Sequence, residues 1–160
     1  MHPTLHTLRL RLQPPQSADA QALAYCANHP AIAEHTRLPY PYQQADAKAW
    51  LAAIAHSRDL HWLIWAEQTL LGAIGLTARA VGVWELGYWL NPRYWRQGLA
   101  CEAATAVCAW AAHNRPTQRL YACHSADNPA SARVLLKLGF RPEPSEPGAE
   151  RHYWLAAQTD

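Results

Sequence analysis

The sequence has no excess of charge of either sign and no long hydrophobic run. Its 160 residues carry a formal net charge of +2 at pH 7, with the two signs mixed along the chain. The lack of a basic stripe argues against nucleic acid or a membrane surface as a partner. No stretch approaches the roughly 20 apolar residues that span a bilayer, and the N-terminus lacks the charged start and apolar run of a signal peptide. We therefore expect a cytoplasmic protein.

The sequence also lacks the spacings of a metal site or a disulfide scaffold. Its four cysteines, at positions 26, 101, 108 and 123, contain no C-x-x-C pair. Cys101 and Cys108 lie seven residues apart on one face of a predicted helix, which packing explains, and a functional role for Cys101 or Cys123 stays open. None of the nine histidines forms an i, i+4 pair on a predicted helix. We expect reduced thiols and no bound metal.

Half of the residues are apolar, which suits one compact domain over residues 1–160 with a substantial core. Hydrophobic periodicity predicts a strand, two helices, three meandering strands, a helix, a strand, a helix and two strands. The strands are predicted at 7–12, 60–66, 70–77, 84–90, 119–123, 140–142 and 151–156. Ser17 is a candidate cap for the first helix, which Pro30 interrupts before a short turn at 31–34, and the second helix spans 45–57.

This order of elements requires a mixed sheet covered by helices, with one parallel crossover, and is α+β in character. A Rossmann domain would alternate strand and helix throughout and would carry G-x-G-x-x-G. The turn after the strand at 84–90 has one glycine and no acidic residue placed for a ribose. The doubly wound fold is therefore disfavoured.

The most informative segment is this turn, Tyr94-Trp95-Arg96-Gln97-Gly98-Leu99-Ala100-Cys101-Glu102-Ala103. It joins a strand to an alanine-rich helix. A strand that turns through glycine into a helix directs free backbone N–H groups, and the positive end of the helix dipole, toward an anion. The segment therefore predicts a phosphate-binding site for a nucleotide-like cofactor. We expect Glu102, in the first helical turn, to be structural, because the dipole favours a carboxylate there.

The helix that follows the strand at 119–123 has clear end signals. Asn128 is a good N-cap, Pro129 takes the first helical position, and Gly139 supplies the left-handed residue that ends the helix.

Together these motifs resemble the GNAT acetyltransferases, in particular the RimJ/RimL-like branch of ribosomal-protein N-terminal acetyltransferases. The resemblance rests on Glu85-Leu86-Gly87-Tyr88-Trp89-Leu90, the turn at 94–103, and Asn128-Pro129-Ala130-Ser131 with Leu135-Leu136-Lys137-Leu138-Gly139-Phe140. It implies a mixed, mostly antiparallel sheet of six to seven strands with a splayed parallel pair and about four helices. It also implies transfer of an acetyl group from acetyl-CoA to a primary amine.

The resemblance assigns the cofactor-binding residues to three places. Backbone amides of Arg96, Gln97, Gly98, Leu99 and Ala100 would hold the pyrophosphate, and the strand edge at Tyr88, Trp89 and Leu90 would pair with the pantetheine. Asn128 would contact the cofactor as well, although it is also an adequate helix cap. Trp95 departs from the Gln or Arg that is general in the family, and the RimL-like branch tolerates tryptophan there.

The catalytic candidates are Glu85 and Ser131. Glu85 precedes the splayed edge, where a carboxylate can take a proton from the amine directly or through water. Ser131 is similar to a serine that the RimL-like branch places near the CoA sulfur, where its hydroxyl would hydrogen-bond the leaving thiolate. Each also has a structural explanation, as a solvated strand charge and as an exposed residue in a first helical turn. Four further candidates are left unranked: Tyr121, Glu150, His152 and Tyr153.

The acceptor is predicted to be an amine, most simply the N-terminal α-amine of a protein or peptide. An α-amino group with a pKa of ~8 needs less help from a base than lysine at ~10.4. A small-molecule amine, and a non-catalytic acyl-CoA-binding module, are the alternatives. Acceptor specificity should lie in the loop at 37–42, the helix containing Trp50 and the last two strands. The resemblance also makes a homodimer an open option.

Overall fold

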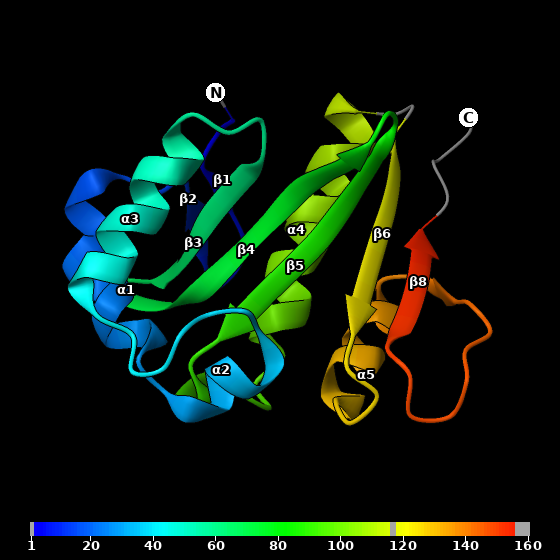
Figure 1. The fold of residues 1–160 in the computed structure, drawn as a ribbon. Coiled ribbons are helices and arrows are strands. Elements are labelled where there is room, and N and C mark those ends of the chain that lie inside the picture. Colours follow the sequence, from blue (N-terminus) through cyan, green and yellow to red (C-terminus); the bar gives the residue numbers. More distant parts are fainter. Residues whose placement is uncertain (1, 116–117, 156–160) are drawn as a thin grey trace.

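The computed structural model describes residues 2–115 and 118–155. Eight strands form one sheet in the order β1-β2-β3-β4-β5-β6-β8-β7 (Figure 1). The strands are β1 (Leu5–His6), β2 (Arg11–Gln13), β3 (Leu60–Ala66), β4 (Thr69–Ala80), β5 (Val83–Leu90), β6 (Arg119–His124), β7 (Arg141–Pro142) and β8 (Arg151–Leu155). The α-helices are α1 (Ala20–Ala27), α2 (Pro30–His35), α3 (Gln44–Ala55), α4 (Leu99–Asn114) and α5 (Pro129–Lys137), with 3₁₀ turns at Ser17–Asp19 and Pro92–Tyr94.

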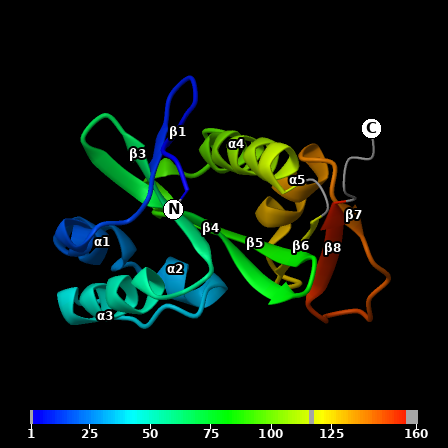
Figure 2. The same ribbon diagram turned by 90° about the horizontal axis from the view of Figure 1, so that it is seen from above.

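The helices cover the two faces of the sheet unequally. One face carries α4 and α5, and the other carries α1, α2 and α3 toward the β2–β4 end (Figure 2). Leu86, Leu120 and Ala122 pack with α4 in the larger core, whereas Leu63 and Ala73 pack with α1 and α3 in the smaller one. Because neighbouring residues of a strand point to opposite faces, alternate side chains of β5, β6 and β8 emerge on a part of the sheet that these three helices leave open.

The single parallel pair in the sheet is β5 with β6. Their register runs over Val83↔Arg119, Trp84↔Leu120 and Glu85↔Tyr121, and no pair follows it among the described residues. The two strands diverge beyond this point (Figure 1). On its other edge β5 stays paired with β4 as far as Gly72↔Leu90. The second half of β5 therefore has one paired edge and one open edge.

Most predicted elements are confirmed. The meander, the α4 crossover and the last helix lie where periodicity places them, and Leu99, Ala103, Val107 and Trp110 of α4 pack in the larger core. The α+β class, the mostly antiparallel sheet and the splayed parallel pair are also confirmed. Over residues 2–115 and 118–155, the sheet has eight strands rather than six or seven, and there are five α-helices rather than about four. Residue 156, predicted as the end of the last strand, lies outside the described residues.

Three local predictions near the N-terminus are wrong. The strand predicted at 7–12 is broken by a turn in which the N–H of Thr7 donates to the carbonyl of Leu10, and Leu8 is 95% exposed. The alternation of apolar and polar residues predicts a continuous strand, whereas Leu8 belongs to the turn between β1 and β2. Gln16, not Ser17, is the N-cap of the first 3₁₀ turn. Pro30 does not interrupt the first helix before a turn at 31–34 but begins the short helix α2. Proline suits the first helical position, and the His29 side chain caps the helix.

Gly72 generates a testable prediction about the β4–β5 pair. A Cβ atom built there would lie 2.0 Å from the carbonyl oxygen of Trp89, which is backbone and cannot move aside. We expect Gly72→Ala to lower the free energy of unfolding by about 2–3 kcal/mol, measured by urea denaturation. Gly87→Ala is the matched control, since its Cβ would meet nothing within 4 Å, and its effect should stay within about 0.5 kcal/mol. Equal effects of the two variants would contradict the steric explanation.

Candidate active site

The turn between β5 and α4 presents backbone donors without partners. Arg96 and Gly98 both have positive φ, at 60° and 74°, and α4 begins at Leu99. In the described part of the chain, the backbone N–H groups of residues 96–101 donate to no acceptor, while that of Glu102 already bonds to the carbonyl of Gly98. A left-handed conformation at a residue with a side chain is strained. A strained turn with free donors at a helix N-terminus fits a bound pyrophosphate.

Trp95 has a structural role in this turn. Its indole Nε1–H donates to the carbonyl oxygen of Leu90 at 2.8 Å, and its side chain is 43% exposed. The indole therefore ties the start of the turn to the end of β5. This contact gives a physical reason for a tryptophan where the wider family has Gln or Arg.

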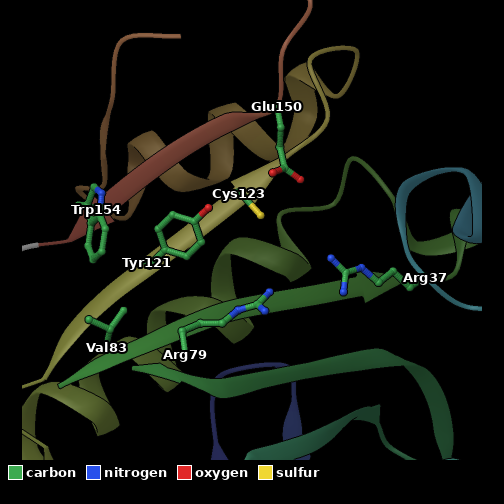
Figure 3. Close-up of a pocket in the computed structure, with 7 residues that line it drawn as sticks. All are labelled: Arg37, Arg79, Val83, Tyr121, Cys123, Glu150 and Trp154. Atoms are coloured by element: carbon green, nitrogen blue, oxygen red, sulfur yellow. The ribbon is translucent and has the colours of Figure 1, made fainter. Parts of the chain in front are cut away.

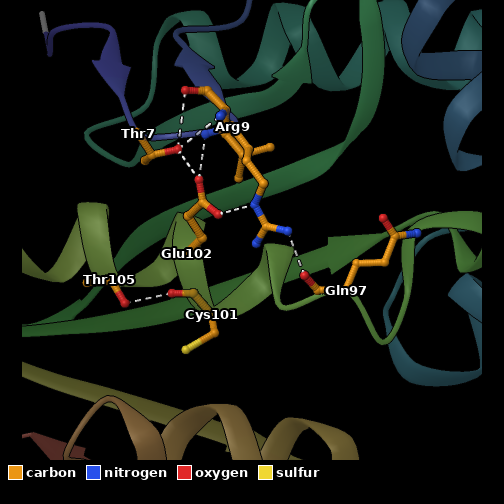
Figure 4. Close-up of polar contacts among 7 residues, drawn as sticks. Thr7, Arg9, Gln97, Cys101, Glu102 and Thr105 are labelled. Atoms are coloured by element: carbon orange, nitrogen blue, oxygen red, sulfur yellow. Dashed lines mark hydrogen bonds and ion pairs between the residues drawn. The ribbon is translucent and has the colours of Figure 1, made fainter.

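Glu102 supports the turn through hydrogen bonds and an ion pair with Thr7 and Arg9, and these contacts form the Glu102 brace (Figure 4). Its Oε1 accepts from the Thr7 hydroxyl at 2.6 Å and from the Arg9 backbone N–H at 2.9 Å, and its Oε2 accepts from Arg9 Nε at 2.6 Å. Arg9 Nη1 also donates to the carbonyl of Gln97 at 2.9 Å. Burial acts to raise the pKa of Glu102, but the bonds from Thr7 and Arg9 outweigh it and lower that pKa. The structural role predicted for Glu102 is therefore confirmed by its contacts.

The open edge of β5 runs through Tyr88, Trp89 and Leu90, the three residues predicted to meet the pantetheine. They pair with Ile74, Ala73 and Gly72 of β4, and no residue of β6 pairs with them. An exposed strand edge of this kind hydrogen-bonds an extended ligand as it would another strand.

Tyr88 and Ser131 meet across this opening, on the α4–α5 face. Their hydroxyl oxygens are 3.0 Å apart, and either group can be the donor. Burial raises the pKa of Tyr88 to about 12, although its bond with Ser131 opposes this, so the phenol stays protonated. Asn128 caps α5 by accepting from the backbone N–H of Ser131 at 3.2 Å. The structure thus brings three of the predicted residues together.

A cavity of about 350 Å³ lies on the opposite face, where β5 and β6 begin to diverge. Figure 3 shows the residues that line it: Arg37, Arg79, Val83, Tyr121, Cys123, Glu150 and Trp154. Arg37 comes from the segment after α2, and the others come from β4, β5, β6, β8 or the residue before β8. Two of the segments predicted to carry acceptor specificity therefore contribute, the loop after α2 and the last strand with the residue before it, whereas none of the seven lining residues comes from β7 or from α3, the helix containing Trp50.

Glu85, the predicted base, lies beside this cavity, and each of its carboxylate oxygens has a partner. Arg79 Nε forms an ion pair with Glu85 Oε2, and the Cys123 thiol donates to Glu85 Oε1 at 3.4 Å. Burial, followed by the negative charge of Glu85, raises the pKa of Cys123 to about 11. Cys123 is therefore a protonated thiol rather than a nucleophilic thiolate at neutral pH.

Tyr121, His152 and Glu150 form a chain of polar contacts along the same face. The Tyr121 hydroxyl is hydrogen-bonded to His152 Nδ1, and His152 Nε2 lies 3.7 Å from Glu150 Oε2. Burial is the largest cause of a raised pKa at Tyr121. Tyr153 points to the other face, where its hydroxyl meets Nε2 of the buried His124 at 3.0 Å. Of the four unranked candidates, Tyr121 and Glu150 thus line the cavity, His152 contacts both of them, and Tyr153 lies in the core.

Sequence patterns did not indicate Arg79 or His124 as residues of interest. Arg79 lies at the exposed end of a strand that the periodicity ends at residue 77, and His124 lies one residue beyond the predicted end of its strand. The alternation of β6 was a usable signal for His124, because it places this side chain on the buried face with Leu120 and Ala122.

Within residues 2–115 and 118–155, no group of three or more His, Cys, Asp and Glu side chains is arranged to hold a metal ion. Over the same residues, no helix is long and apolar enough to cross a membrane. All four cysteines are free thiols.

The turn with free backbone donors, the open edge of β5 and the cavity on the far face all lie around the point where the sheet divides. The sequence matches the family described as "Acetyltransferase (GNAT) domain" over residues 9–141. The chain belongs to the GNAT acetyltransferases, and it is an acetyl-CoA-dependent N-acetyltransferase.

Known proteins agree with this assignment. The chain is 31% identical over 151 residues to the "Uncharacterized N-acetyltransferase YoaA" of Bacillus subtilis (strain 168), covering 89% of this chain and 85% of that protein. It shares its fold with RimL, a ribosomal L7/L12 alpha-N-protein acetyltransferase, in complex with coenzyme A (TM-score 0.82, 19% identity, 96% and 97% of the two chains). A similar fold occurs in the ribosomal-protein-S5-alanine acetyltransferase of Vibrio fischeri (TM-score 0.79, 20% identity, 96% and 94%).

The Glu102 brace generates a prediction with a pH signature. Glu102→Gln should lower the free energy of unfolding at pH 7 by about 1 kcal/mol and should raise the Kd for CoA, because the Gln97 segment loses its support. The pKa of Glu102 lies below its ordinary value of 4.5 in the folded protein. Its stabilising contribution is therefore complete above pH 4.5 and is lost as the pH falls through the folded-state pKa. The difference between wild type and variant should shrink over that range, as measured by thermal unfolding.

Asp46→Asn is the control for this prediction. Asp46 is also a carboxylate in a first helical turn, where its Oδ2 accepts from the Gln43 backbone N–H at 2.8 Å, but it lies on α3. This variant should destabilise the protein without changing the Kd for CoA in a calorimetric titration. Equal CoA affinity in the two variants would show that the brace does not shape the turn.

Proposed function

We propose that this protein acetylates the N-terminal α-amine of a protein or peptide, as a member of the RimJ/RimL-like branch. The observation that carries the proposal is the placement of the two carboxylates at the cavity. Of the two carboxylates there, Glu85 is held by Arg79, and Glu150 is 57% exposed with only His152 nearby. Such a site suits an α-amine, whose pKa of ~8 leaves roughly a tenth of the molecules neutral at pH 7, better than a lysine. The fold shared with RimL and with ribosomal-protein acetyltransferases supports the proposal.

Acetyl-CoA supplies an activated acetyl thioester, and the residues present fit it. We assign the pyrophosphate to the free N–H groups of Arg96, Gln97, Gly98, Leu99 and Ala100, and the pantetheine to the open edge at Tyr88, Trp89 and Leu90. Asn128 uses its Oδ1 as a helix cap, and its amide NH₂ has two donors that are available to the cofactor.

Ser131 is proposed to stabilise the leaving thiolate. If the Tyr88 phenol donates to Ser131 Oγ, the serine proton is free to point toward the sulfur, and the raised pKa keeps the phenol in its donor form. A hydroxyl hydrogen bond to a developing thiolate lowers the barrier without a full proton transfer. This role is consistent with the modest acidity of serine.

For the amine proton we propose Glu150 as the acceptor, with Glu85 as the second carboxylate of the site. Glu150 lines the cavity directly, whereas Glu85 lies behind Arg79 and Cys123. His152 and Tyr121 continue the contacts from Glu150 along the strand face and offer a route for the proton away from the amine.

The class of acceptor is tested with matched peptides. The protein is incubated with acetyl-CoA and either a peptide with a free N-terminus and no lysine, or the same peptide with a blocked N-terminus and one internal lysine. Mass spectrometry and release of free CoA should show acetylation of the first peptide alone. Acetylation of the lysine peptide at an equal rate would refute the proposal, as would exclusive use of small polyamines or antibiotic amines.

The two carboxylates are distinguished by their pH–rate profiles. Glu150→Gln should lower kcat/KM at pH 7 by about 10²-fold. Activity should recover as the pH rises toward 9, since the α-amine then loses its proton to solvent. Glu85→Gln should cause a smaller loss without this recovery, because it leaves Arg79 unpaired rather than removing the base. The reverse ranking would identify Glu85 as the base.

A further inference from the structure

Arg37 is a cation without a partner at the edge of the cavity. It lies just after α2, is exposed, and its side chain extends toward the cavity (Figure 3). Among residues 2–115 and 118–155, no hydrogen bond, ion pair or cation–π contact involves its guanidinium group. The two hydrogen bonds on either side of it, from the Thr36 hydroxyl and the Leu38 N–H, hold the backbone rather than the side chain.

The other two charged residues that line the cavity, Arg79 and Glu150, each have a polar neighbour. Arg79 is neutralised by Glu85. Glu150 has His152 at 3.7 Å and is the group that we assign to the reacting amine. The cavity therefore offers one unsatisfied cation, Arg37, and one carboxylate, Glu150, which are not in contact with each other.

This arrangement matches an acceptor that carries an anionic group close to its amine. Guanidinium binds a carboxylate through two parallel N–H donors, and a charge-assisted bond of this kind discriminates against a neutral isostere. A cavity of about 350 Å³ accommodates a few residues of a peptide end rather than a folded surface. Arg37 would then hold the anion while the amine lies at Glu150.

We propose that Arg37 selects acceptors with a carboxylate near the reacting amine: an acidic side chain at the first or second position of a peptide, or the carboxylate of a free amino acid. This inference rests on the proposed acetylation of α-amines. Beyond the α-amine, it specifies that the acceptor carries a negative charge near that amine.

The experiment compares amidated tripeptides Ala-X-Ala in which X is Asp, Asn or Lys, together with free aspartate, using the full chain and saturating acetyl-CoA. We expect kcat/KM for the Asp peptide to exceed that for the isosteric Asn peptide by about tenfold, with the Lys peptide lowest. The preference should decrease in high salt, because the arginine is exposed. Free aspartate separates the two sources of the carboxylate.

Arg37→Gln should reduce the Asp-to-Asn ratio to about one, and Arg37→Glu should invert the order in favour of Lys. Any effect of Asp on the amine's own pKa persists in these variants, so a lost preference reports the guanidinium group. Arg141→Gln is the matched control: it removes the same charge from an exposed position on the edge strand β7 and should keep the wild-type ratio. Circular dichroism confirms that all variants fold.

The outcomes separate the two proposals. Acetylation of all three peptides at equal rates would overturn the role of Arg37 and leave the α-amine proposal standing. Acetylation of free aspartate with no turnover of any peptide would refute the peptide acceptor and support the anion site. A wild-type ratio in Arg37→Gln would show that another group reads the charge.

Discussion

The structure depends on the point at which β5 and β6 stop pairing. Three residues of each strand are joined in parallel, ending at Glu85 and Tyr121. Beyond them β5 is held only by β4, so its other edge keeps unsatisfied backbone groups. Buried backbone groups without partners are costly, and a bound ligand strand satisfies them. The same divergence interrupts the sheet, so that groups on its two faces can approach a common reaction centre.

Several separate features maintain this opening. The Trp95 indole fixes the turn to the end of β5, and the Arg9–Glu102 pair fixes it to the β1–β2 turn at the other end of the sequence. At the far side, the Tyr88–Ser131 contact joins β5 to α5. The turn between β5 and α4 is thus preorganised by side-chain contacts that leave its backbone donors free, and a preorganised turn loses less entropy when it binds a ligand.

Much of the fold could be predicted from the sequence, because its strongest signals are local. The turn at 94–103 and the Asn128–Pro129 helix start are defined by neighbouring residues. The β1–β2 turn could not be predicted, because Leu8 continues the apolar alternation and only tertiary packing shows that it is exposed. The ion pair between Arg79 and Glu85 depends on the irregularity in the β4–β5 register at Arg79. The position of Arg37 at the cavity depends on how the loop after α2 folds over the sheet. Neither relationship has a signal in sequence spacing.

The position of the cavity, on the face opposite α4 and α5, has a kinetic consequence. In the proposed arrangement, acetyl-CoA and the acceptor would reach the divided sheet from different sides, and neither would block the path of the other. Burial keeps the thiol of Cys123, which lines the cavity, protonated by raising its pKa to about 11, so this thiol is a poor nucleophile for carrying the acetyl group. The proposed arrangement therefore predicts a sequential mechanism through a ternary complex rather than a ping-pong one.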